Sequence, residues 1–255
     1  MPNFNTKDIA FAAIFTSLVA TSTMVFSVFV PATKGFFNIG EVMIYTAALV
    51  MGPWVGAFAG GVGSSLADVI LGYGQFAPGT LVIKGIEGFI VGYLGRLGLS
   101  KLGIQSWRVV TIVVGVVCGL LVWMIGTGYV SGTLELTMGI SEGFLSTPTF
   151  ITLFNVPQIF WMGVATLIFL SIIVMGFSIT PKIGWVVIAV LAGGIEMIVG
   201  YFLYETYILQ IGIVTAMAEI PFNLGQMIIG LLVAVPLSRS VLKILPKLQQ
   251  ANTKS

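Results

Sequence analysis

The chain has 255 residues, of which 57% are hydrophobic and 8% are charged, and its mean hydropathy is +1.08. Soluble domains carry about 25% charged residues, so this composition indicates a protein embedded in lipid. A net charge of +2 without basic runs does not suggest a nucleic-acid surface, and the absence of histidine removes the commonest general base and metal ligand and excludes the serine–histidine hydrolases.

Long apolar runs follow one another along the chain and predict transmembrane helices, each of which needs about 20 apolar residues. The first uncharged run, residues 9–33, is too long for the core of a signal peptide, so we expect a retained span. Further along, Gly52-Pro53 predicts a tight turn between two short helices. The expected all-α bundle has eight spans, at residues 9–30, 39–53, 55–72, 79–97, 109–131, 151–177, 183–208 and 219–242.

The basic residues favour one side of these spans. If the N-terminus is inside, only Lys34 falls in an outside segment, as expected when cytoplasmic loops are enriched in Lys and Arg. We therefore predict that both termini are cytoplasmic and that residues 1–255 form a single integral membrane domain. The inside residues are Lys7, Arg96, Lys101, Arg108, Lys182, Arg239, Lys243, Lys247 and Lys254.

Polar side chains gather in the outer half of the predicted bundle. Each ionisable residue costs about 2.5–3.5 kcal/mol to insert into a membrane, so such residues are candidates for function. The nearly apolar inner half favours a one-sided binding site over an ion path through the membrane, although Asp68, Lys84 and Glu87 could instead pair and hold helices together. The outer group comprises Glu41, Asp68, Lys84, Glu87, Glu196, Tyr201, Tyr204, Glu205, Glu219, Asn223 and Gln226, with Tyr73 and Phe76 in a loop above them.

Small residues form stripes on several predicted helices. Glycines recur at helical spacing in the third and fourth spans, which favours close packing of helix backbones. The first span carries two such faces, Ala12/Thr16/Ala20 and Ala13/Ser17, and either could pack internally or meet another membrane protein. Because the phosphate loop, the zinc signature and the nucleophile elbow are all absent, we expect neither an enzyme nor a metal site.

Several blocks resemble the substrate-binding S components of energy-coupling factor (ECF) transporters. They include Ile39-Gly-Glu41, Thr80-Leu-Val-Ile-Lys84-Gly-Ile-Glu87 and Glu219-Ile-Pro221-Phe-Asn223-Leu-Gly-Gln226. The resemblance covers residues 9–97 and 183–242. Because S components usually have six helices, residues 98–182 would be an inserted helix pair.

The resemblance implies a multi-pass protein of a prokaryotic cell membrane that captures a vitamin or cofactor precursor, riboflavin-type or related, from outside. It implies no covalently bound cofactor, and it implies three partners, a transmembrane coupling subunit and two ATPases, which alone would use ATP. In this family a small-residue face of the first helix meets the coupling subunit, so Ala12, Ala13, Thr16, Ser17 and Ala20 are the candidates here.

The resemblance also implies a substrate site at the outer helix ends. Lys84 would meet an anionic or carbonyl group, Asn223 and Gln226 would hydrogen-bond a heterocycle or amide, and the aromatic residues would stack on a ring. The alternative is a stand-alone secondary transporter of a small polar solute, driven by an ion gradient. The candidate site residues are Glu41, Tyr73, Gln75, Lys84, Glu87, Tyr204, Asn223 and Gln226.

Overall fold

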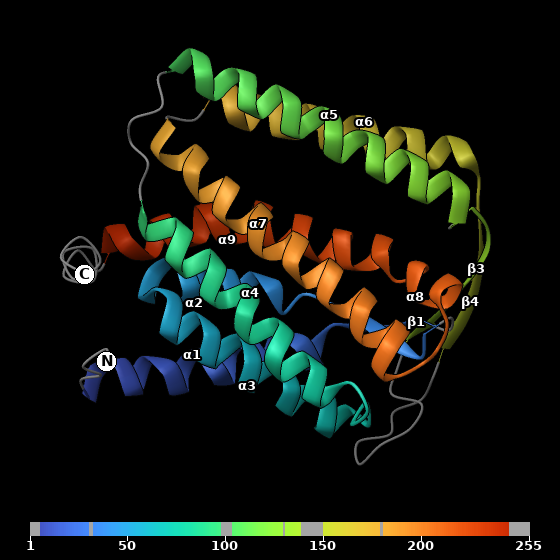
Figure 1. The fold of residues 1–255 in the computed structure, drawn as a ribbon, viewed down its shortest axis with the longest axis horizontal. Coiled ribbons are helices and arrows are strands. Elements are labelled where there is room, and N and C mark those ends of the chain that lie inside the picture. The colour runs from blue at the N-terminus through green and yellow to red at the C-terminus, as the bar shows by residue number, and fades with distance from the viewer. Residues whose placement is uncertain are drawn as a thin grey trace.

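The computed structural model describes residues 6–30, 33–97, 104–129, 131–138, 150–178 and 181–244. Within these ranges the protein is a bundle of helices, as predicted (Figure 1). A π-helical turn, η1 (Tyr204–Ile208), continues α7, and a short helix, α8 (Ile213–Met217), precedes α9. The long helices are α1 (Thr6–Val25), α2 (Glu41–Met51), α3 (Pro53–Leu71), α4 (Ala77–Leu97), α5 (Ile104–Tyr129), α6 (Gln158–Ser178), α7 (Pro181–Leu203) and α9 (Ile220–Ile244).

Six segments of the described chain are long and apolar enough to cross a membrane. They contain α1, α3, α5, α6, α7 with η1, and α8 with α9. Helix α2 has only 11 residues, and α4 carries Lys84, Glu87 and Arg96. These two helices are shielded by neighbours, because α2 packs against α3, α4 and α9, and α4 packs against α3 and α7. The protein is therefore a multi-pass membrane protein.

Four short strands differ from the prediction of helices alone. They are β1 (Ser27–Val30), β2 (Gly35–Asn38), β3 (Gly132–Met138) and β4 (Phe150–Val156), and they form an antiparallel sheet in the order β2-β1-β3-β4.

The strands shorten two predicted spans. Helix α1 ends at Val25 instead of residue 30, and α6 begins at Gln158 instead of residue 151. The reason is that a short apolar run rich in β-branched and aromatic residues suits a strand as well as a helix, and the backbone groups of these runs pair across the sheet.

The two ends of the bundle differ. The start of α1 and the end of α9 lie at one end, whereas the sheet, α8 and the link between α3 and α4 lie at the opposite end (Figure 1). This second end is the outer one in the predicted orientation. At the first end, Gly52 takes φ +89° and Pro53 opens α3, so the predicted turn between α2 and α3 is present. Arg96 donates a hydrogen bond to the Met51 carbonyl there, at 2.7 Å.

Glycines bring the backbones of α3 and α4 into contact. A Cβ atom on Gly60 would lie 2.6 Å from the Lys84 carbonyl oxygen, and one on Gly56 would lie 2.8 Å from that of Gly88. A side chain at either position would separate the helices. The glycine stripes therefore serve internal packing, and they fix the position of Lys84.

The structure separates the two small-residue faces of α1. A Cβ atom on Gly63 of α3 would lie 2.8 Å from the Thr16 carbonyl oxygen, and Ala20 is 5% exposed, so the Ala12/Thr16/Ala20 face turns toward the bundle. Ala13 and Ser17 are exposed. Of the two faces, only the Ala13/Ser17 face is open to another molecule.

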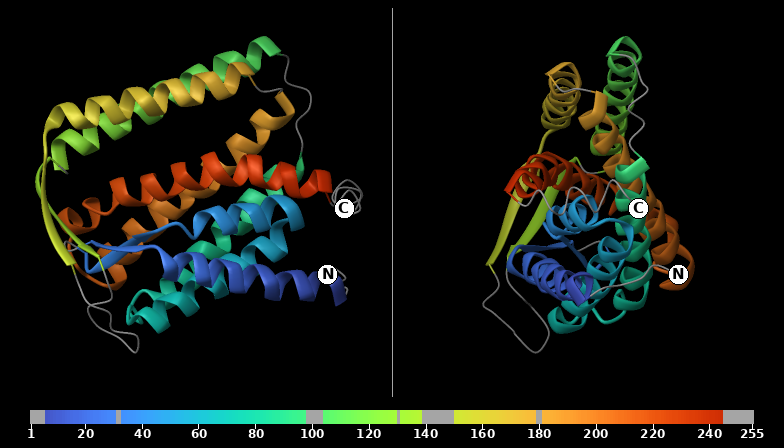
Figure 2. Two further views of the ribbon diagram at one scale, coloured as in Figure 1. Left: turned by 180° about the vertical axis from the view of Figure 1, so that it is seen from behind. Right: turned by 90° about the vertical axis from the view of Figure 1, so that its left-hand side faces the viewer.

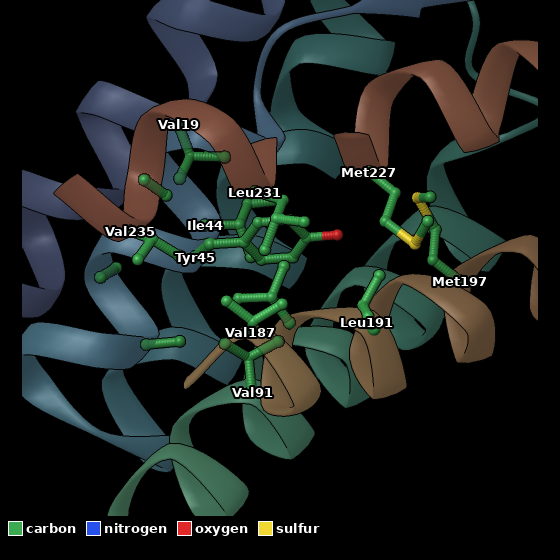
Figure 3. Close-up of a cluster of buried hydrophobic side chains, with 14 of the residues drawn as sticks. Val19, Ile44, Tyr45, Val91, Val187, Leu191, Met197, Met227, Leu231 and Val235 are labelled. Atoms are coloured by element: carbon green, nitrogen blue, oxygen red, sulfur yellow. The ribbon is translucent and has the colours of Figure 1, made fainter. Parts of the chain in front are cut away.

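The apolar core lies between α1, α2, α4, α7 and α9 (Figure 3). Ile44 and Tyr45 of α2 are fully buried there, beside Leu231 of α9 and Val187 of α7. The Tyr45 hydroxyl donates a hydrogen bond to Glu87 Oε1 at 2.7 Å. This hydrogen bond therefore connects the apolar core to Glu87, a residue of the site described next.

Helices α5 and α6 form a hairpin that stands apart from the other helices in the end-on view (Figure 2, right). Trp107 of α5 is 2% exposed, and its indole N–H donates to the Gly176 carbonyl of α6 at 2.9 Å. The same indole ring packs on Gly184 of α7. Trp107 therefore joins the hairpin to the bundle.

Candidate functional site

A small cavity with an open mouth lies at the end of the bundle that carries the sheet. Five helices and strand β2 contribute to its wall, because α1, α3 and α7 end here and α4 and α9 begin here. The lining residues are Thr23, Gly35, Phe36, Asn38, Ser64, Asp68, Phe76, Thr80, Lys84, Tyr201, Glu219, Asn223 and Gln226.

Lys84 lies between two carboxylates. Its ammonium nitrogen is 2.5 Å from Glu41 Oε1 and 3.1 Å from Glu87 Oε2, and all three side chains are at most 4% exposed. The Tyr45 hydroxyl donates to the other oxygen of Glu87. A buried charge is tolerated only when it is paired and hydrogen-bonded, and the Lys84 ammonium meets that condition, whereas Glu41 Oε2 has no hydrogen-bond partner among the described residues. Of the pairing that the sequence left as an alternative, the structure shows Lys84 with Glu87. The second partner of Lys84 is Glu41 instead of Asp68.

Two amide side chains connect α9 to strand β2. The Gln226 amide nitrogen donates to Asn223 Oδ1 at 2.8 Å, and Gln226 Oε1 accepts a hydrogen bond from the backbone N–H of Asn38 at 3.2 Å. Asn38 Oδ1 in turn accepts from the Gly40 N–H at 2.8 Å. All three amides are at most 9% exposed, so they form a rigid polar wall.

Two carboxyl groups, Asp68 and Glu219, also line the cavity. They are 3% and 6% exposed. The Tyr201 hydroxyl donates to Thr80 Oγ1 at 3.0 Å, and Thr80 lines the cavity together with Asp68. Asp68 Oδ2 and Glu219 Oε2 have no hydrogen-bond partner among the described residues. Each carboxyl group can therefore accept a hydrogen bond from a molecule in the cavity.

Aromatic rings complete the wall. Phe36, Phe76 and Tyr201 line the cavity, and Tyr73 supports Phe36 from outside with its ring centroid at 4.5 Å. The Lys84 ammonium lies 5.5 Å from the centroid of the Tyr201 ring. A planar ligand would find both apolar faces and hydrogen-bonding groups here.

The predicted site residues occupy three different positions. Lys84, Asn223 and Gln226 line the cavity, and Glu41 and Glu87 lie directly behind Lys84. The other three do not line the cavity, since Tyr73 and Gln75 lie in the link between α3 and α4 and Tyr204 begins η1. The Tyr204 hydroxyl donates to the Gln75 carbonyl at 2.8 Å, and the Tyr204 ring packs on Gly79, whereas Tyr73 stacks on Phe36.

Several lining residues were not among the predicted site residues. Asp68, Phe76, Tyr201 and Glu219 were recognised as outer polar or aromatic residues without being assigned to the site. Six others were missed altogether. Residues 35–38, Gly-Phe-Phe-Asn, are too short and do not alternate, so the sequence held no clear signal that this segment is a strand lining the cavity. The missed residues are Thr23, Gly35, Phe36, Asn38, Ser64 and Thr80.

The described residues hold no cluster of three or more His, Cys, Asp or Glu side chains that could bind a metal ion. The cavity wall instead presents amides, hydroxyls, carboxyls and aromatic rings. This set suits binding of an organic solute by hydrogen bonding and stacking.

Two known proteins are similar to parts of this chain. An uncharacterized protein in the gap 3' region of Pyrococcus woesei is 46% identical over 113 residues, which are 44% of this chain and 69% of that protein. The thiamine precursor transporter HmpT of Lactococcus lactis subsp. cremoris is 30% identical over 93 residues, or 36% of this chain and 56% of that protein.

A model of the family described as "ECF-type riboflavin transporter, S component" matches residues 3–175. The match includes the predicted block 9–97 and most of the segment 98–182, and it ends before the block 183–242. It is a family of transport components and not of enzymes. The chain belongs to the S component family of ECF-type riboflavin transporters.

Proposed function

We propose that this chain captures a vitamin or vitamin precursor with a nitrogen heteroaromatic ring, riboflavin-type or related, in the cavity at the outer end of the bundle. The observation that carries the proposal is the convergence of buried amides and aromatic rings on this cavity. Ligand sites are mostly apolar with a few convergent polar groups that fix orientation, and this cavity has both.

The amide wall is the part that would recognise the ring. Asn223 and Gln226 offer donor and acceptor atoms side by side, and their mutual hydrogen bond holds them in place before a ligand arrives. Such preorganisation lowers the entropic cost of binding. Phe36, Phe76 and Tyr201 would contact the faces of the ring.

For Lys84 we propose a mainly supporting role. Its charge is already matched by Glu41 and Glu87, so an anion would have to compete with two carboxylates. Lys84 can still offer a hydrogen bond to a ligand carbonyl, and its ion pair with Glu41 connects α4 to α2 beside the cavity. The expectation that it meets an anionic group therefore has little support.

The relatives support a vitamin ligand without choosing one. The family description names riboflavin, and the Lactococcus relative is named for a thiamine precursor. Both compounds contain nitrogen heteroaromatic rings, so both suit the same combination of amides and aromatic side chains.

Uptake would need partners, because this chain has no phosphate-binding loop with which to use ATP. We propose that a transmembrane coupling subunit and two ATPases supply the energy. The coupling subunit would dock on the exposed Ala13/Ser17 face of α1, since small residues let helix backbones approach closely.

The first test is mass spectrometry of small molecules released from the purified protein, followed by titration with riboflavin and with thiamine. We expect a stoichiometric vitamin or precursor and tight binding of one of the two. In Gln226→Leu the ligand loses the amide that we expect to hydrogen-bond its ring, and a buried ligand group left unpaired costs about 1–3 kcal/mol, or roughly 5–150-fold in affinity.

Gln105→Leu is the matched control, because Gln105 is exposed on α5, far from the cavity. Equal affinities of the two variants would contradict the proposed site. Uptake by vesicles that lack ATP and partner subunits would instead support the stand-alone transporter.

A further inference from the structure

Acidic side chains without a cationic partner in the described part of the chain line the cavity, whereas its basic side chain is already paired. Asp68 and Glu219 line it, both are more than nine-tenths buried, and each has one oxygen without a partner among the described residues. These two oxygens are acceptors that the protein leaves unused. A ligand that donates hydrogen bonds, or that carries positive charge, would satisfy them.

No positive charge is left over to balance a negative ligand. Lys84 is the basic residue of the cavity wall, and Glu41 and Glu87 already face its ammonium group. Lys34 also lies at this end, but it is exposed in the turn between β1 and β2 and does not line the cavity.

The helix N-termini do not supply positive charge either. The positive end of a helix dipole attracts anions, and both α2 and α9 begin near the cavity. Helix α2 begins at Glu41 itself, whose carboxylate faces Lys84, and Glu219 directly precedes the first residue of α9. An anion at either helix start would therefore lie close to a carboxyl group of the protein.

We propose that the cavity accepts an uncharged or cationic ligand that donates hydrogen bonds to Asp68 and Glu219, and that it rejects the phosphorylated form of the same compound. Asp68 is the specificity-determining residue, because its carboxyl group is 3% exposed, lines the cavity and keeps Oδ2 without a hydrogen-bond partner among the described residues. This inference rests on the proposed function, since it names the chemical class of ligand for the same site.

The physical reason is desolvation. A phosphate group carries up to two negative charges, and burying it beside two carboxyl groups without a free cation gives it no compensating partner. We expect the unphosphorylated compound to bind at least about 100-fold more tightly than its phosphate ester.

The test compares two pairs of compounds on the purified full-length protein in lipid nanodiscs. The pairs are riboflavin with riboflavin 5'-phosphate, and thiamine with thiamine monophosphate. Affinities are measured for the wild type, Asp68→Asn, Glu219→Gln and the control Glu196→Gln. Glu196 is a half-buried carboxyl residue of α7 that does not line the cavity.

We expect the wild type to prefer the unphosphorylated member of whichever pair binds. Asp68→Asn should reduce this preference at least about tenfold, Glu219→Gln should reduce it less, and Glu196→Gln should leave it unchanged. Thermal unfolding of each variant identifies any that does not fold, and the wild-type comparison still decides the inference in that case.

Three outcomes overturn the inference in different ways. If the phosphate ester binds as tightly as its parent, the ligand class is wrong while the proposed function stands. If the preference survives Asp68→Asn in a folded protein, the assignment of Asp68 is wrong. If neither pair binds, the proposed vitamin-binding function fails, and the inference fails with it.

Discussion

Helix packing differs between the region around the cavity and the α5–α6 hairpin. Around the cavity, glycines bring α3 and α4 together and buried charged residues connect α2 with α4. In the hairpin, Gly115 and Gly119 of α5 face Phe169 of α6, and Trp107 and Arg108 of α5 contact α6 through the indole N–H and the guanidinium group. Helices can pack in lipid without buried ion pairs, so the charged residues around the cavity point to a role beyond helix packing.

The comparison shows that polar residues occur where there is a cavity to line. Lys84, Glu87 and Asn223 are expensive in a membrane, yet all are buried within one end of the bundle. The hairpin, by contrast, exposes many large apolar side chains that suit lipid, among them Val113 and Leu167. The following substitutions test this difference, from the largest expected effect to the smallest.

Gly60→Leu should prevent the bundle from folding. Its side chain would meet the Lys84 carbonyl, where even a Cβ atom lies at 2.6 Å, so we expect a loss above about 4 kcal/mol in the free energy of unfolding. Gly163→Leu in α6 is the control, since a Cβ atom there has nothing within 4 Å. Size-exclusion chromatography and thermal unfolding in detergent measure both. Equal stability of the two variants would mean that the close contact of α3 and α4 is not needed.

Lys84→Met should destabilise the protein by about 3–5 kcal/mol, because Glu41 and Glu87 would remain buried without a cation. The control is the triple variant Lys84→Met/Glu41→Gln/Glu87→Gln, which removes all the charges and should recover much of the stability. Thermal unfolding with and without riboflavin reports stability and binding together. A triple variant as unstable as Lys84→Met would show that Lys84 acts through something other than charge balance.

Trp107→Phe should lower the free energy of unfolding by at least about 1 kcal/mol and leave ligand affinity unchanged, because it removes the hydrogen bond to the Gly176 carbonyl and part of the ring that packs on Gly184. Trp161→Phe is the matched control, since its buried indole nitrogen has no partner among the described residues. A change in affinity for Trp107→Phe would show that the hairpin and the cavity are coupled.

Ala13→Leu combined with Ser17→Leu should change stability by less than about 0.5 kcal/mol, because both residues are exposed. It should nevertheless reduce co-purification of the proposed coupling subunit and ATPases, since the larger side chains would keep a partner helix away. Val116→Leu, on an exposed part of α5, is the control. Unchanged co-purification would move the docking face away from Ala13 and Ser17.

The sequence by itself determined the membrane bundle, the turn at Gly52-Pro53 and the gathering of the polar residues at one end of the bundle. The first two features depend on local sequence, and the third follows from the free-energy cost of placing polar groups in a membrane. An apolar run predicts a span wherever it occurs, Gly-Pro favours a turn, and a charge in the membrane is retained only for a reason. For that reason Lys84, Asn223 and Gln226 could be predicted as site residues, and the structure places all three in the cavity wall.

Only the tertiary structure decided which residues meet. The Lys84–Glu41 pair spans 43 positions of sequence, and the hydrogen bond between Asn38 and Gln226 spans 188. Likewise, the inward face of α1 depends on Gly63 of α3, and the inward position of Phe36 depends on strand pairing. Hydropathy and spacing carry no information about such distant partners, because close packing and hydrogen bonding are decided between elements and not within them.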